Sequence, residues 1–534
     1  MAYDPITLGI LWNRLISITD EIVASLVRTS FSTVVRESYD LSCVLLDARG
    51  HSLAQGSWSG TAFVGTIPKT VRHLLKRFPP ETLKPGDVLA TNDPWLGTGH
   101  LFDITVTRPV FRKSRLLGFT TTVTHLPDIG GRGFSSNARE VYEEGLRLVP
   151  CKLYDRGKPV AAMFELIRSN VRVADQVIGD INANITANEL GSARLLTFMD
   201  EYGIEDLSSL SDSILSHSEQ AMRAEIAKIP PGTYTNTVMA EGVDGDITIA
   251  CRIDVSGDRI SIDYAGSSPQ SSFAINTPFC YTYAFTAYAL KCLTIPDIPN
   301  NEGAFRPVVA SAPTGSILNP TFPAATGGRH ALGHFVPTAI FGALQSVLPE
   351  RVLADPGLIN LIRFYGRNLQ GERFSTVYFA SGGMGAHAHG DGLTATPAPS
   401  NICSTPVEIF ETLTGILVSR RAIRPDSGGR GRHRGGHGQE IQFVNATDHP
   451  VSLSLFANRT RFAARGFQGG CDGAPRLVLL NGQPVDPKSQ QELAPGETVD
   501  FAEAGGGGFG PPEGRDPSVI ARDERGAMVK AGTV

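Results

Sequence analysis

The sequence lacks the usual marks of a secreted, membrane or nucleic-acid-binding protein. Its seven cysteines are scattered and form no C-x-x-C pair, which predicts reduced thiols. No run of about 18 apolar residues occurs, so no membrane-spanning helix is predicted. Asp4 and Arg14 interrupt the apolar N-terminal stretch, and no small-residue cleavage site follows, which argues against a secretory signal. We expect a soluble, cytoplasmic protein.

The chain also lacks a charge excess and a phosphate-binding loop. Charged residues make up 19% of it and the formal net charge is -5, which argues against nucleic acid as a partner. The basic, Gly-rich tract 426–436 has no interleaved aromatic residues, so it is not read as an RNA-binding tract. No G-x-x-x-x-G-K-[ST] motif occurs, so this chain is not expected to bind ATP by that route. The run 505–510 favours a structural loop over a ligand-binding one.

A length of 534 residues predicts roughly two to four folded units. Apolar residues at helical spacing predict helices at residues 6–32, 177–202, 281–292 and 334–348. Period-two patterns with β-branched residues predict strands at 40–46, 103–110, 116–124, 234–255 and 260–264. The consistent fold class is α+β. We expect an N-terminal α+β metal-binding region at 1–265, a central α/β region at 266–420 and a Gly-rich β region at 421–534.

One predicted helix carries a polar stripe. Asp180, Asn184 and Asn188 recur every four residues within 177–202 and therefore share one face. Such a stripe is typical either of a solvated surface or of a packed polar interface, and the sequence leaves both open.

The stretch 91–130 holds two H-x-x-D modules, His100 with Asp103 and His125 with Asp128. They flank two strand-like runs joined by the polar segment 112–115. If the runs pair as a hairpin that turns near Arg112, position 100 lies opposite position 125. Two imidazoles and one or two carboxylates at one end of a hairpin form a ligand set for a divalent transition metal, although H-x-x-D is also common in capped turns and surface pairs.

Two further groups of polar residues have open interpretations. His387, His389 and Asp391 lie in a glycine-rich segment and form either a second metal cluster or an accidental His-x-His pattern. Arg329, His330 and His334 precede or begin the helix predicted at 334–348, where a first helical turn could meet an anionic intermediate. Helix capping and local pairing explain these residues equally well.

Blocks along nearly the whole chain resemble the hydantoinase B/oxoprolinase family in order and spacing. These blocks are RESYDLS at 36–42, NDPWLGTGHLFD at 92–103, HLPDIGG at 125–131, EEGL at 143–146, 170–172 with 179–180, IPNNEGAFRP at 298–307, GSILNP at 315–320, DSGGRGRHRGG at 426–436, and 505–510 with 515–517. The resemblance implies a large, mixed, multi-layer fold. It also implies a subunit that works with a hydantoinase A-type ATPase subunit in a hetero-oligomer.

The resemblance implies an ATP-dependent hydrolase of cyclic amides such as hydantoins, 5-oxoprolines or lactams. In the related acetone carboxylases a His, an Asp three residues later and a second His hold the metal, and these positions match His100, Asp103 and His125. The expected ion is Mn or Zn, with Fe as a third choice, and ATP enters through the partner. Asp128 and His330 are the candidate catalytic residues, Asp128 as an acceptor that orients an imidazole.

One departure from the family pattern bears on the substrate. Many members carry a His where this chain has Phe63, so the substrate cannot be copied from any one relative. Two alternatives remain open: a subunit of an ATP-dependent ketone carboxylase, and a non-catalytic scaffold. The sequence alone leaves undetermined the substrate, the metal and the stoichiometry with the partner.

Overall fold

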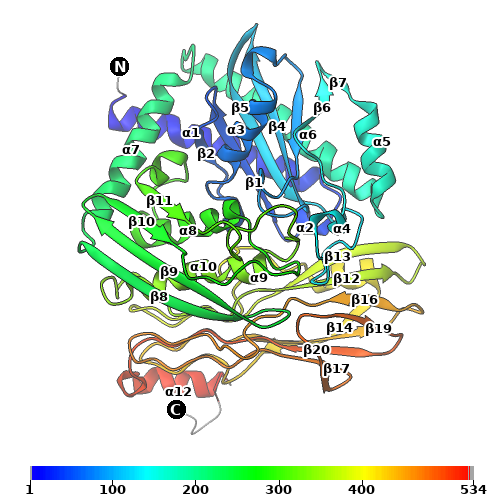
Figure 1. The fold of residues 1–534 in the computed structure, drawn as a ribbon, viewed down its shortest axis with the longest axis vertical. Coiled ribbons are helices and arrows are strands. Elements are labelled where there is room, and N and C mark those ends of the chain that lie inside the picture. Colours follow the sequence, from blue (N-terminus) through cyan, green and yellow to red (C-terminus); the bar gives the residue numbers. More distant parts are fainter. Residues whose placement is uncertain (1–2, 527, 530–534) are drawn as a thin grey trace.

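The computed structural model describes residues 3–526 and 528–529 and shows a mixed α/β protein. This described part contains four β-sheets with helices packed on them in layers (Figure 1). The N-terminal elements form the upper part of Figure 1, the C-terminal strands form the lower part, and helix α12 lies at the lower end. The predicted α+β class and the strand-rich, Gly-rich C-terminal part are confirmed.

A seven-stranded antiparallel sheet builds the N-terminal part, in the order β2-β1-β5-β4-β3-β6-β7. Its strands are β1 (Leu41–Asp47), β2 (Ser52–Gln55), β3 (Val88–Thr91), β4 (Asp103–Arg112), β5 (Arg115–His125), β6 (Cys151–Asp155) and β7 (Lys158–Pro159). Every residue of β1 is buried, because helices cover both faces of the sheet at this point. The strands predicted at 40–46, 103–110 and 116–124 correspond to β1, β4 and β5.

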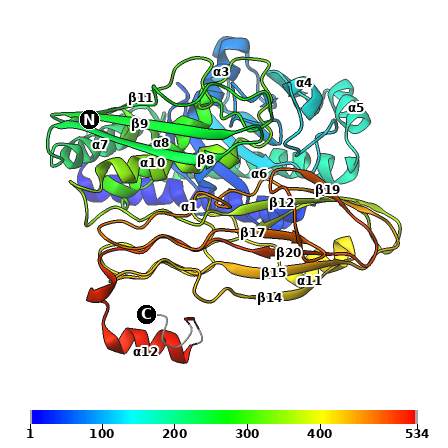
Figure 2. The ribbon, with the colours of Figure 1, turned by 60° about the horizontal axis from the view of Figure 1, so that its bottom comes forward.

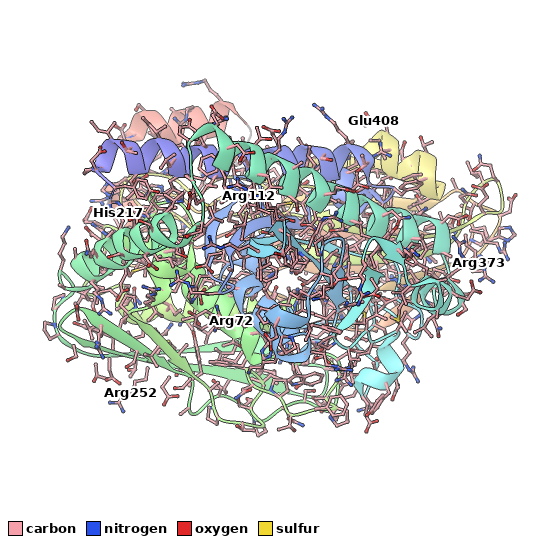
Figure 3. All side chains as sticks on the ribbon, turned by 90° about the horizontal axis from the view of Figure 1, so that it is seen from above. Arg72, Arg112, His217, Arg252, Arg373 and Glu408 are labelled. Atoms are coloured by element: carbon pink, nitrogen blue, oxygen red, sulfur yellow. The ribbon has the colours of Figure 1, made fainter. Side chains whose placement is uncertain are left out.

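Two long helices cover one face of this sheet. Helix α1 (Pro5–Thr29) begins at Asp4, whose carboxylate accepts the backbone N–H groups of the first turn. Helix α6 (Ala174–Glu201) packs beside α1 and against β4 and β5, as the view from above shows (Figure 3). Arg112, labelled in that view, ties the end of β4 to α6 through a 2.7 Å ion pair with Asp200.

The polar stripe on α6 is a packed interface. Asp180, Asn184 and Asn188 are fully buried. The side-chain amide of Asn184 donates to Thr124 (2.9 Å), and that of Asn188 donates to Thr122 (2.8 Å), both on β5. Of the two interpretations left open by the sequence, the structure therefore selects the packed one, because amide groups that leave water need such partners.

A four-stranded sheet, in the order β11-β10-β9-β8, forms the central part. Its strands are β8 (Gly232–Glu241), β9 (Asp246–Ser256), β10 (Arg259–Asp263) and β11 (Val308–Ser311), so the strand predicted at 234–255 is a hairpin. Helix α10 (Phe335–Leu344) packs on β8 and β9, and α8 (Phe279–Thr294) packs on α10. A short helix, α9 (His330–Gly333), directly precedes α10.

Two further sheets form a sandwich in the C-terminal part, in the orders β13-β12-β16-β19 and β14-β15-β20-β17-β18. Their strands are β12 (Asn360–Arg367), β13 (Arg373–Ala380), β14 (Ile416–Ile423), β15 (Gln439–Asn445), β16 (Val451–Ser454), β17 (Leu477–Leu480), β18 (Gln483–Pro484), β19 (Gln490–Leu493) and β20 (Thr498–Ala502). Apolar side chains from both sheets share one core, which includes Phe364, Tyr378 and Phe443.

Glycine-rich segments next to this sandwich pack backbone against backbone. Segments 382–392, 427–438, 466–473 and 504–510 run alongside one another between the strands and α12 (Figure 2). They exchange main-chain hydrogen bonds, such as those from Gly383 to Ala504 (2.9 Å) and from Gly429 to Gly506 (2.8 Å). A Cβ atom on Gly505 would overlap the carbonyl oxygen of Ser427. The run 505–510 is therefore structural, as expected.

The remaining elements connect these layers. They are α2 (Thr33–Arg36), η1 (Thr61–Phe63), α3 (Ile67–Arg77), η2 (Pro80–Thr82), α4 (Val141–Glu144), α5 (Ala161–Asn170), α7 (Ser208–Ile226), η3 (Glu302–Phe305), α11 (Val407–Thr414), η4 (Pro512–Gly514) and α12 (Pro517–Arg525). Among the described residues, no helix combines the length and apolar character needed to cross a bilayer.

His437 makes the glycine-rich layer sensitive to acid. It is fully buried, its Nδ1 accepts the N–H of Gly428 (2.9 Å), and burial lowers the pKa of its imidazole to about 4. The unfolded state, with an ordinary pKa of 6.5, binds the proton more readily, so stability is lost as pH falls from 6.5 towards 4.

We therefore predict that the unfolding free energy of His437→Gln decreases less between pH 7 and pH 5 than that of the parent protein. One such proton contributes up to about 1.4 kcal/mol per pH unit to the unfolding free energy. Urea denaturation of the metal-free protein at pH 7 and pH 5 measures the difference for both proteins. An unchanged pH 7 to pH 5 difference in the variant would contradict the assignment.

Candidate metal centre

The structure brings His100, Asp103 and His125 together in the interior. The exposed fraction of each is 3% or less, and one ligand atom from each lies within 4.8 Å of the others. The group sits where strands β4 and β5 meet the turn that precedes β4. Within the described part of the chain, no other group of three or more His, Cys, Asp or Glu side chains brings its potential ligand atoms this close together.

The hairpin that carries these residues differs from the predicted one in register. Asp103, and not His100, pairs with His125 across β4 and β5. The expected register is wrong for two reasons: the turn lies at residues 113–114, with Lys113 in the left-handed conformation, and a bulge follows Val110. His100 instead lies in the turn before β4.

Gly99 allows that turn to approach the rest of the site. Its φ is +98°, and a Cβ atom there would lie 2.7 Å from the side chain of Arg329. A left-handed residue without a side chain is therefore needed directly before His100.

The potential ligand atoms converge on one carboxylate oxygen. Oδ1 of Asp103 lies 2.7 Å from Nε2 of His100 and 3.2 Å from Nδ1 of His125. The contact with His100 nevertheless lacks the geometry of a hydrogen bond, and Nε2 of His125 also has no partner among the described residues. Unpaired polar atoms are costly in the interior, and donors that face a common point are typical of a cation site.

The two carboxylate oxygens of Asp103 have different partners, and Arg329 binds only one of them. Its guanidinium donates to Oδ2 (2.6 Å) and to the carbonyl of Thr98 (2.6 Å), and the Thr98 hydroxyl donates to the same Oδ2 (2.6 Å). The guanidinium also lies 4.1 Å from the ring centroid of Tyr281. Oδ2 is thereby saturated, and Oδ1 stays free for the imidazoles.

These charges set the protonation states. Burial would raise the pKa of Asp103, but His100 and Arg329 hold it well below its usual range. Burial, reinforced by Arg329, lowers the pKa of His100 to about 4. At neutral pH the site therefore contains an ionised carboxylate and a neutral His100, which are the forms that bind a metal.

Asp40 lies beside this group, and sequence reasoning missed it. Its Oδ2 lies 3.7 Å from Nδ1 of His125, and its carbonyl accepts the N–H of His125 (3.1 Å). Burial raises its pKa to about 6, although His125 opposes this shift. The signal was present in the block RESYDLS: β1 pairs with β5 so that Leu41 faces Thr124, which brings Asp40 beside His125.

His330 lies one aromatic ring away from the ligand group. Its imidazole stacks on Phe134 (5.2 Å between centroids), and Phe134 in turn contacts the ring of His125 (6.5 Å). Both ring nitrogens are buried and lack hydrogen-bond partners among the described residues. Burial lowers its pKa well below the ordinary value, so the ring is neutral. The neighbouring His334 lies with its Nε2 3.3 Å from the hydroxyl of Tyr281.

Asp128 lies outside the ligand group. Its Oδ1 forms an ion pair with the guanidinium of Arg172 (2.7 Å), and the guanidinium of Arg363 lies 3.7 Å from the same oxygen. Among the described residues, no hydrogen bond or ion pair joins Asp128 to His100 or His125. Its observed surroundings are those of a buried structural ion pair.

The other candidate groups are also separate from the centre. Asp391 is held by both terminal nitrogens of Arg515 (2.8 Å each), while His389 is exposed and lies 3.5 Å from Glu350. Phe63 is buried among apolar side chains that include Val44 and Ile67.

Comparison with known proteins identifies the family of the chain. The family described as hydantoinase B/oxoprolinase matches residues 4–512. The B-type subunit of a putative D-/L-hydantoinase from Pseudomonas sp. (strain NS671) is 30% identical, over 97% of this chain and 92% of the relative.

Two solved structures share the fold. The ATP-dependent caprolactamase from Pseudomonas jessenii is 26% identical with a TM-score of 0.91, over 99% of this chain and 95% of that chain. A nucleotide-free acetone carboxylase structure is 21% identical with a TM-score of 0.90, over 99% of this chain and 78% of that chain. The predicted multi-layer fold is confirmed by both.

Removal of the Arg329 guanidinium should destabilise the protein strongly. In Arg329→Ala the buried carboxylate of Asp103 loses its cation, which in other proteins costs about 3–5 kcal/mol. The measurement is chemical denaturation of the metal-free chain. Arg132→Ala serves as the control, because its pair with Glu143 is at the surface and should contribute less than about 1 kcal/mol. Equal losses in the two variants would refute the central position of the Asp103–Arg329 pair.

Proposed function

The chain belongs to the hydantoinase B/oxoprolinase family, and we propose that it is the metal-dependent catalytic subunit of an ATP-dependent cyclic amide hydrolase. The observation that carries the proposal is the buried group of His100, Asp103 and His125. Support for the reaction comes from relatives described as a caprolactamase and as the B-type subunit of a hydantoinase, both of which act on cyclic amides by their names.

The residues present fit a divalent transition metal. Imidazole nitrogens and a carboxylate oxygen suit Mn, Zn and Fe, and three protein ligands leave positions for water or substrate. In our proposal His100, Asp103 and His125 hold the ion, with Asp40 beside them as a fourth candidate. A divalent ion bound there would supply Lewis acidity and lower the pKa of a bound water.

The chain's own residues then have distinct tasks. Arg329 keeps Asp103 ionised and turned towards the imidazoles. Phe102 stacks on His125, with centroids 5.1 Å apart, and together with Phe134 it forms an apolar wall that excludes water from that side. The neutral His330 lies behind this wall, and its lowered pKa makes its imidazole a weak base, so we keep it as a candidate catalytic residue and assign it no proton-transfer step.

The partner in this proposal is a hydantoinase A-type ATPase subunit. An unstrained amide is a poor electrophile, and phosphorylation of its oxygen by ATP would activate it for attack by water. Because this chain has no recognisable phosphate-binding loop, the phosphorylation is assigned to the partner.

Loss of single ligands should empty the metal site. We expect about one tightly bound divalent ion per chain, Mn or Zn ahead of Fe, and we expect His100→Ala and His125→Ala to remove it while the fold persists. Elemental analysis of the purified proteins measures the metal, and circular dichroism measures the fold. His389→Ala is the matched control, because that imidazole is exposed and outside the group. Full occupancy in both ligand variants would rule out this metal assignment.

Reconstitution with the partner should reveal ATP-coupled ring opening. The isolated chain should not hydrolyse ATP, whereas the pair should hydrolyse ATP and open a cyclic amide. The assay supplies ATP, a panel of hydantoins, oxoprolines and lactams, a panel of ketones, and labelled bicarbonate. Label in a ketone-derived acid without ring opening would favour the carboxylase alternative, and metal binding without any turnover would favour the scaffold.

A further inference from the structure

Glu144, at the end of helix α4, is a fully buried carboxyl group without a charged partner. It takes part in no ion pair within the described part of the chain. Its Oε1 accepts the backbone N–H groups of Thr326 (2.8 Å) and Gly327 (2.5 Å), and its Oε2 has no hydrogen-bond partner there. Burial, with Glu143 adding to it, raises the pKa of this carboxyl to about 8. Burying a carboxyl group that has no charged partner and one unpaired oxygen costs free energy, so this placement needs an explanation.

The local backbone fixes this placement. The carbonyl of Glu144 accepts the N–H of Gly133 (3.1 Å), the carbonyl of Glu143 accepts that of Arg132 (2.8 Å), and the N–H of Leu146 donates to Ile129 (2.7 Å). The blocks HLPDIGG and EEGL are therefore joined side by side. The first of these blocks begins at His125, so Glu144 is anchored to the chain that carries one candidate ligand.

From Glu144 the contacts lead directly to a second ligand. The carbonyl of Gly327, whose N–H is held by Glu144, lies 3.3 Å from Nδ1 of His100. An Nδ1–H that donates to this carbonyl leaves Nε2 as the free, lone-pair nitrogen that faces Asp103. One residue, Gly327, thus connects the carboxyl group to the tautomer and orientation of His100.

The same segment also reaches the third ligand. Two residues beyond Gly327, Arg329 donates to Oδ2 of Asp103. The segment has little freedom to move: a Cβ atom on Gly327 would lie 3.0 Å from Oε1 of Glu144, and one on Gly328 would overlap the ring of Phe456. Glu144 therefore holds the start of a tight segment that touches two ligand residues.

We infer that Glu144 is a positioning residue for the metal ligands, which acts through Gly327 on His100 and through the 326–329 segment on Arg329. The inference rests on the proposed function, because it assigns a purpose within the same site. In other metal sites the groups that hold a ligand His from behind are carboxylates or carbonyls in direct contact. Here the carboxyl group acts one residue further out, because it binds the N–H of the residue whose carbonyl contacts the ligand His.

A merely structural carboxyl group would affect the fold and leave the metal affinity of the folded protein unchanged. The test therefore uses equilibrium binding of Zn²⁺ and Mn²⁺ to the full, metal-stripped chain, and the visible absorption of the Co²⁺-substituted protein, which reports ligand geometry. Thermal denaturation is followed separately. None of these measurements depends on turnover or on the partner.

The expected results separate the variants. Glu144→Ala should weaken metal binding by about 10- to 100-fold and alter the Co²⁺ spectrum. Glu144→Gln should restore most of the affinity and the parent spectrum, because its amide oxygen can accept the same two N–H groups. Glu143→Ala is the matched control, since its neighbouring carboxylate pairs with Arg132 at the surface, and it should bind like the parent. If Glu144→Ala does not fold, Gly327→Ala displaces the same contact without altering Glu144 and should also weaken binding.

Two results would overturn the inference while the proposed function stands: parent-like affinity and spectrum in folded Glu144→Ala, or binding by Glu144→Gln as weak as that by Glu144→Ala. A parent chain that binds neither Zn²⁺, Mn²⁺ nor Co²⁺ would overturn the proposed metal site itself, and the inference with it.

Discussion

The buried ion pair between Asp103 and Arg329 is the contact on which the candidate centre depends. It joins the start of strand β4 to a segment more than two hundred residues later in the chain, so the N-terminal sheet and the helical layer around α10 are fixed relative to each other there. A lone carboxylate in this position would take up a proton, and a lone guanidinium would be still more costly to bury. Because Arg329 binds Oδ2 only, the same pair that holds the layers together also leaves Oδ1 directed at the imidazoles.

The C-terminal part completes the other side of the centre. Phe456, which follows strand β16, packs on Phe134 and His330, and the amide of Asn458 donates to the carbonyl of Ala331 in α9. Strand β16, which precedes these residues, pairs with β12 and β19 of the sandwich. The glycine-rich segments beside the sandwich pack closely, since a Cβ atom on Gly435 or Gly506 would overlap a main-chain oxygen of a neighbouring segment.

Much of the candidate centre could be predicted from the sequence, because its candidate ligands lie in two short motifs at the ends of adjacent strands. The strand pairing followed from alternation, but its register did not, since neither the bulge after Val110 nor the turn at 113–114 has a signature in the pattern. Asp40 was missed because its approach to His125 depends on the pairing of β1 with β5, two strands far apart in the sequence. Glu144 could not be found either, because its role lies in a long-range contact with main-chain N–H groups, which leave no trace in residue type.

The carboxylates at the candidate centre outnumber the guanidinium groups beside them. Ionised Asp40 and Asp103 carry two negative charges against the single positive charge of Arg329, in a region almost closed to water. The raised pKa of Asp40 reflects this excess, since Asp103 adds to the effect of burial. A divalent cation would reverse the sign and leave one net positive charge, which favours an ionised Asp40 and an anionic group next to the cation. If the proposed metal site holds, the charges of these residues favour a dication together with one negative charge from water or substrate, because a monovalent cation would leave that anionic group without electrostatic support.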